Sequence, residues 1–171
     1  IGTDAGQIGV APGMMQRSWI ENGRRYIHYV TEAPISNAFT IASANYAVDR
    51  AKWGDVDIEI FHDPAHRANV DRMLRGARAA LDYDSKQFGP YPFRQLRFVE
   101  VPSDAYQLQM TAHSSLITYA EGFSLVRPAA DPRAMRRPAP NLAQIAAHAV
   151  DSARLRNRHP SRRGGARAGR C

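Results

Sequence analysis

The sequence predicts an α+β fold, because several strand patterns are followed by one long amphipathic helix and then by further strands. Strands and helices do not alternate strictly, which argues against a fully parallel α/β sheet. Of the 171 residues, 44% are hydrophobic and 23% are charged, a composition typical of a globular domain rather than a disordered or membrane-embedded chain. The only cysteine is Cys171, which excludes an internal disulfide and a cysteine zinc cage.

The first fifty residues are expected to form strands. Residues 24–30 alternate and are rich in Tyr and Ile, and they follow a Glu-Asn-Gly turn at residues 21–23. Residues 38–48 place Phe39 and Ile41 on one parity, so they are predicted to form a second, continuous strand.

A strand and a helix are predicted next. Residues 55–61 alternate apolar with acidic side chains, as a strand with one face in solvent does. Asp63 and Pro64 then provide an N-cap and a first-turn proline for a helix. Gly89 and Pro90 are expected to end this helix. Its apolar residues fall on one stripe: Val70, Met73, Leu74, Ala77 and Leu81.

Three further elements are predicted after the helix. Residues 95–101 carry apolar side chains on both parities, which indicates a strand buried on both faces. Residues 115–119 form a short strand pattern, and the Ala-rich residues 141–150 favour a helix.

Several of these segments, taken in order, resemble one protein family. Residues 88–93 are Phe-Gly-Pro-Tyr-Pro-Phe and precede a strand ending in Val-Pro, residues 116–121 are Leu-Ile-Thr-Tyr-Ala-Glu, and residues 145–148 end in His. The set resembles the zinc-dependent aminopeptidases of the aminopeptidase N and leukotriene A4 hydrolase type, which are gluzincin metallopeptidases. Residues 63–69 are most similar to the bacterial branch of that family that is fused to ABC transporter permeases.

The resemblance implies a domain organisation. Residues 1–50 would be the end of a β-rich N-terminal domain, residues 51–148 the start of a thermolysin-like catalytic domain, and residues 149–171 an Arg-rich tail that stays unfolded. In the permease-linked branch the parent protein would be associated with a membrane through permease segments, whereas this sequence shows no targeting or transmembrane segment and leaves the compartment undetermined.

The resemblance also implies a zinc site, of which this chain retains little. The family carries His-Glu-x-x-His on one helix, where two histidines hold zinc and the glutamate is the general base. Only His148 matches a ligand here, because Ala149 stands at the base position and Ser152 at the second ligand position. No acidic residue after Asp151 remains to be the third ligand. We therefore expect no bound zinc, and no catalytic residue or hydrolysis in this chain alone.

Two residues match family positions near the substrate. Tyr119 and Glu121 are the candidate substrate-binding residues, and peptides are the substrate class that the resemblance implies for the parent enzyme. The loop whose glutamate binds the substrate amino group aligns with residues 109–113, where Ala112 occupies the glutamate position.

The sequence predicts a departure from the ancestral reading frame near His148, which would explain the loss of the His-Glu-x-x-His motif.

Other constellations have simpler explanations. His62 and His66 have zinc-ligand spacing, but Pro64 begins the helix between them, so the two are not expected to share a helical face. Ser114 and Ser115 lie beside His113 without a nucleophile-elbow motif. The remaining single carboxylates are expected to be solvated and the remaining large aromatics to be core or turn residues: Asp82, Asp84, Glu100, Trp19, Trp53 and Tyr91.

Charge is distributed unevenly along the chain. Residues 1–126 hold 12 Lys and Arg against 14 Asp and Glu, whereas residues 127–171 hold 11 Arg against Asp131 and Asp151 and have no aromatic residue. The basic segment could bind nucleic acid non-specifically, although it lacks aromatic residues for base stacking and nucleic acid is not the partner we expect. A noncatalytic interaction or scaffold domain is the other alternative to an inactive peptidase fragment.

Overall fold

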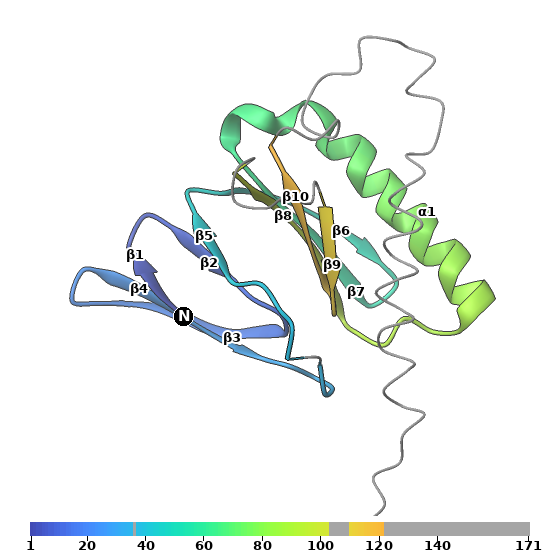
Figure 1. Ribbon diagram of the computed structural model, residues 1–171, viewed down its shortest axis with the longest axis horizontal. Helices are drawn as coiled ribbons and strands as arrows, with labels where there is room; N and C mark the ends of the chain where they lie inside the picture. The colour runs from blue at the N-terminus through green and yellow to red at the C-terminus, as the bar shows by residue number, and fades with distance from the viewer. Residues whose placement is uncertain (36, 103–109, 122–171) are drawn as a thin grey trace, which may run out of the picture.

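The computed structural model describes residues 1–35, 37–102 and 110–121, which form three β-sheets and one long helix (Figure 1). The predicted α+β class is confirmed at this level. The helix and the largest sheet lie at one side of the molecule, and two smaller sheets built mainly from the first 44 residues lie at the other.

The smaller sheets come from the N-terminal part of the chain. One has the order β1 (Gly2–Asp4), β4 (Arg24–Val30) and β3 (Met14–Glu21), and the other pairs β2 (Ile8–Val10) with β5 (Ala42–Ala44). The predicted strand at residues 24–30 is confirmed as β4. The turn before it has positive φ at Asn22 (49°) and Gly23 (74°), the conformation that a two-residue hairpin loop requires.

The single strand predicted at residues 38–48 is wrong. Its C-terminal part belongs to β6 (Ala47–Trp53), which joins the large sheet, whereas β5 pairs with β2 in a different sheet. Phe39 and Ile41 precede β5 and are 46% and 56% exposed. Alternation of side chains indicates extended backbone, but it does not reveal that the partner strand changes between residues 44 and 47.

The large sheet has the order β6-β7-β8-β10-β9. Its central strands β7 (Val56–His62), β8 (Gln95–Val101) and β10 (Leu116–Ala120) are parallel, and the edge strands β6 and β9 (Met110–His113) are antiparallel to their neighbours. All seven residues of β8 are buried, as predicted.

The helix predicted from Pro64 begins as a 3₁₀ turn. Asp63 caps the turn η1 (Pro64–Asn69) by accepting from the Ala65 backbone N–H at 2.8 Å. His66 interrupts the helical conformation with φ −102° and ψ 28°, and α1 (Val70–Phe88) follows. Gly89, with φ 93°, ends the helix as expected.

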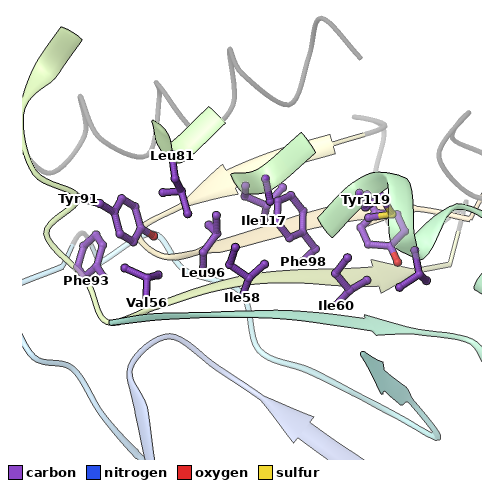
Figure 2. Close-up of a cluster of buried hydrophobic side chains, with 13 residues drawn as sticks. Val56, Ile58, Ile60, Leu81, Tyr91, Phe93, Leu96, Phe98, Ile117 and Tyr119 are labelled. Atoms are coloured by element: carbon purple, nitrogen blue, oxygen red, sulfur yellow. The ribbon is translucent and has the colours of Figure 1, made fainter. Parts of the chain in front are cut away.

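Two cores cover the two faces of the large sheet. Between α1 and the sheet, the predicted helical stripe packs on apolar side chains of β7, β8 and β10 (Figure 2). On the other face, Val10 packs against Phe61, Val99 and Leu116, and Ala42 of β5 adds to this second core. The small two-stranded sheet therefore covers the face that α1 leaves open.

Arg97 connects these layers from the middle of β8. Its guanidinium donates to the Glu59 carboxylate at 2.7 Å and to the backbone carbonyls of Ala11, at 2.9 Å, and Gly13. The side chain is buried and also lies against the Tyr29 ring. It therefore ties the segment between β2 and β3 to the central sheet.

Candidate functional site

A pocket lies where the parallel strands end. β7, β8 and β10 finish at the same edge of the sheet, and the residues at or just beyond their ends include Asp63, Pro102 and Glu121. Open sheets with parallel strands commonly bind ligands at this edge. A pocket of about 330 Å³ occupies the position here, with residues 40–46 forming its other wall.

Glu100 is the buried carboxylate of this pocket. It is 3% exposed, and its Oε2 accepts from the Asp63 backbone N–H at 3.0 Å while its Oε1 bonds His66 Nδ1. The expectation that Glu100 is solvated is therefore wrong. The 3₁₀ turn folds over the end of β8 and supplies donors from residues more than 30 positions earlier in the chain.

The charge of Glu100 influences its neighbours. Tyr46 donates its hydroxyl to the Glu100 carbonyl at 2.8 Å, and burial together with the carboxylates of Glu100 and Glu121 raises the pKa of Tyr46 to about 12. Burial, followed by the Glu100 charge, also raises the pKa of Tyr119. The hydrogen bond to Glu100 raises the pKa of His66 above the ordinary histidine value.

The two predicted substrate-binding residues lie at the end of β10. Tyr119 is buried in the core beneath α1, where its hydroxyl donates to the Phe61 carbonyl at 3.4 Å (Figure 2). Glu121 lines the pocket, and its backbone N–H donates to the Val101 carbonyl at 3.0 Å. The metal-ligand candidate His148 and the base position Ala149 lie outside the described residues.

His62 and His66 bond to different carboxylates. His62 Nε2 lies 2.9 Å from Asp49 Oδ2 of β6, whereas His66 bonds to Glu100 of β8. The two rings are therefore not paired as metal ligands. Within residues 1–35, 37–102 and 110–121, no three His, Cys, Asp or Glu side chains form a group that could hold a metal ion.

Both ring nitrogens of His113 face the segment before β5. Its Nε2 lies 3.0 Å from Thr40 Oγ1 and its Nδ1 lies 3.1 Å from the Ala38 carbonyl. Ser115 Oγ is hydrogen-bonded to the Gln95 side-chain amide at 3.2 Å. His113 therefore fastens the segment before β5 onto the edge strand β9.

Two carboxylates of α1, Asp82 and Asp84, differ in their exposure to solvent. Asp82 is exposed and accepts from Trp53 Nε1 at 2.7 Å. Asp84 is buried, its Oδ2 has no hydrogen-bond partner among the described residues, and burial raises its pKa. The expectation of solvation is thus wrong for Asp84. Its charge predicts exposure to solvent, but its position on the helix places it on the buried face of α1.

The aromatic residues have structural positions. Tyr91 is buried and donates to the Gln95 carbonyl at 3.2 Å, as expected for a core or turn aromatic. Trp19 instead lies on the hairpin, where it stacks on Tyr26 with ring centres 5.4 Å apart and lies beneath Arg17. Its ring therefore contacts neighbours from the same hairpin.

Comparison with known proteins adds no relative: no protein-family model matches the chain, and no curated protein matches it significantly. Among the described residues, α1 is the only long helix, and it is not apolar enough to cross a membrane.

Proposed function

We propose that the chain is an inactive piece of a zinc metallopeptidase of the aminopeptidase N type. The observation that carries the proposal is the way in which the resembling segments assemble. The helix and the Phe-Gly-Pro-Tyr-Pro-Phe turn lead into β8, and Leu-Ile-Thr-Tyr-Ala forms β10 directly beside it. Segments that resemble one family at separate places in the sequence are thus neighbours in a single sheet.

The domain division follows from the same proposal. The two small sheets would be the end of the N-terminal β domain, and the five-stranded sheet with α1 would be the start of a thermolysin-like catalytic domain. The basic tail predicted at residues 149–171 lies outside the described residues. The pocket at the end of β8 and β10 includes Glu121, one of the two residues that match family positions near the substrate.

The residues present do not fit a catalytic zinc. The described residues hold no group of three ligands, and the sequence offers only His148 at a family ligand position. A single imidazole does not retain zinc against dialysis, so we expect the chain to lack the metal that would activate water in the parent enzyme. Hydrolysis of N-terminal peptide bonds is therefore assigned to the parent and not to this polypeptide.

Zinc content and sequence context test the two halves of the proposal. The purified, dialysed chain should contain no stoichiometric zinc by elemental analysis and should not cleave an aminoacyl p-nitroanilide. Ala149→Glu with Ser152→His should still bind zinc poorly, because the third ligand is missing. Stoichiometric zinc in the unchanged chain would contradict the account of the lost site.

The family assignment has its own test. The DNA that encodes the region after His148 should contain a Glu-x-x-His continuation in one of the other two frames. If neither frame contains one, the departure from the reading frame is refuted, and a noncatalytic domain is favoured over a peptidase remnant.

A further inference from the structure

The turn η1 is fastened to the end of β8 by one carboxylate. Glu100 accepts the Asp63 backbone N–H at one oxygen and His66 Nδ1 at the other. The turn is also closed internally, since the His66 backbone N–H donates to the Asp63 carbonyl at 2.8 Å. Glu100 therefore holds the N-cap residue of the turn and one residue within it.

We propose that His66 and Glu100 form a pH-sensitive latch that holds the turn Pro64–Asn69 on the end of β8 and thereby fixes one wall of the adjacent pocket. Asp63 and Glu100 both line that pocket, so a movement of the turn changes its shape. The proposal does not depend on the peptidase assignment.

The two partners differ in their access to water, which is what makes the pair responsive to pH. The His66 side chain is 33% exposed, so protons reach its ring, whereas the Glu100 side chain is 3% exposed. A buried carboxylate is costly unless it is compensated by a positive charge or several donors. Protonated His66 provides that charge, whereas the neutral ring can still donate its Nδ1–H but leaves the Glu100 charge uncompensated.

The groups around His66 favour its protonated form. Glu100 on β8, which bonds the ring, Asp63 before the turn and Glu121 after β10 are all acidic, and together they raise the pKa of His66 against the opposing effect of burial. From the same turn, Arg67 is held by Asp49 of β6 at 2.9 Å, and Asp49 also bonds His62 of β7. The hydroxyl groups near Glu100 belong to Tyr46 and Tyr119, which are neutral at physiological pH, and burial raises the pKa of both still further.

The direction of the response follows from the raised pKa of His66. Because protonation is favoured in the folded state, the latch is strongest below the histidine pKa of the unfolded chain and weakens as the pH rises through the folded value. The break in helical conformation at His66 lies inside the turn, ahead of the first residue of α1, Val70. The turn can therefore loosen without unwinding the helix that covers the core.

Nuclear magnetic resonance of the full chain tests the latch. The His66 ring should titrate at a higher pH in the folded chain than in the same chain in urea. The protection factor of the Asp63 amide, which corrects hydrogen exchange for its intrinsic pH dependence, should fall several-fold as the pH rises through that titration.

Two variants and one control separate the latch from general destabilisation. His66→Asn keeps a side-chain N–H near the position of Nδ1 but carries no charge, so Asp63 protection should become independent of pH. Glu100→Gln should lower the His66 titration toward that in urea. His28→Asn changes an exposed histidine on β4 and should leave the pH dependence intact.

The outcomes that overturn the proposal are distinct. A folded His66 titration at or below that in urea would exclude the charge pair. Asp63 protection that is independent of pH in the unchanged chain, or unaltered pH dependence in His66→Asn, would show that the turn is not held by the charge of His66.

Discussion

Replacing Arg97 by methionine should destabilise the fold strongly, because three acceptors lose the same donor. Arg97 is 4% exposed and donates hydrogen bonds to the Glu59 carboxylate and to the carbonyls of Ala11 and Gly13. Methionine fills most of the volume, so the loss is chiefly electrostatic. Removing one partner of a buried ion pair typically costs about 3–5 kcal/mol, out of a total stability of about 5–15 kcal/mol.

Arg50 offers a matched control at the same carboxylate. Its Nε lies 3.1 Å from the other Glu59 oxygen, but its side chain is 64% exposed. Exposed pairs contribute about 0–1 kcal/mol, so Arg50→Ala should have little effect. Urea unfolding of both variants measures the difference.

The double variant Arg97→Met with Glu59→Leu refines this comparison. It also removes the carboxylate that has lost its buried partner, but the two carbonyls stay without their donor, so it should recover only part of the lost stability. A loss for Arg97→Met that does not exceed the loss for Arg50→Ala would refute the reasoning, since burial would then make no difference at this carboxylate.

Three further predictions concern stability and are measured by urea unfolding. Asp84→Asn should stabilise the chain at neutral pH, because burial raises the pKa of Asp84 and disfavours its ionised form in the folded state. The gain in stability should disappear in acid, where Asp84 is protonated, and equal stability of the two chains at neutral pH would contradict this prediction. Gly13→Ala should lower the free energy of unfolding more than Gly23→Ala does, although both glycines have positive φ. A Cβ at Gly13 would lie 2.5 Å from the Val30 carbonyl oxygen, whereas a Cβ at Gly23 meets nothing within 4 Å. Equal losses of stability would exclude this steric argument. Ile58→Ala should cost about 2–5 kcal/mol, because Ile58 is fully buried beneath α1, and the exposed Ile20→Ala, with about 0.5 kcal/mol or less, is its control.

Strong periodicity made the centre of the fold predictable. β7 and α1 each carry enough apolar positions to define their period, and β8 is marked by apolar residues on both of its faces. Four residues of the helical stripe are buried as expected, and Leu74 is half-buried. β1 and β2 have three residues each, too few for alternation to be recognised. The division between β5 and β6 escaped prediction because it depends on a change of partner strand and not on local backbone preference.

The candidate site was predictable only in part, since its contacts join distant segments. The family resemblance points to Glu121, whereas the sequence alone predicts that Glu100 is exposed to solvent. A signal for Glu100 did exist: Arg97 and Glu100 are charged residues inside a strand predicted to be buried on both faces. The charge of such a buried residue must be compensated by partners from other elements. A charged residue in a buried strand therefore indicates where distant segments come into contact.

The bonds from Arg97 also constrain the order in which the chain can fold during synthesis. Arg97 reaches carbonyls 84 and 86 positions earlier, and β8 emerges from the ribosome long after the β3–β4 hairpin. The hairpin has only local pairing and can form early, but its docking must wait for β8. Until then Val10 lacks its packing partners Val99 and Leu116, so its apolar side chain stays in contact with water.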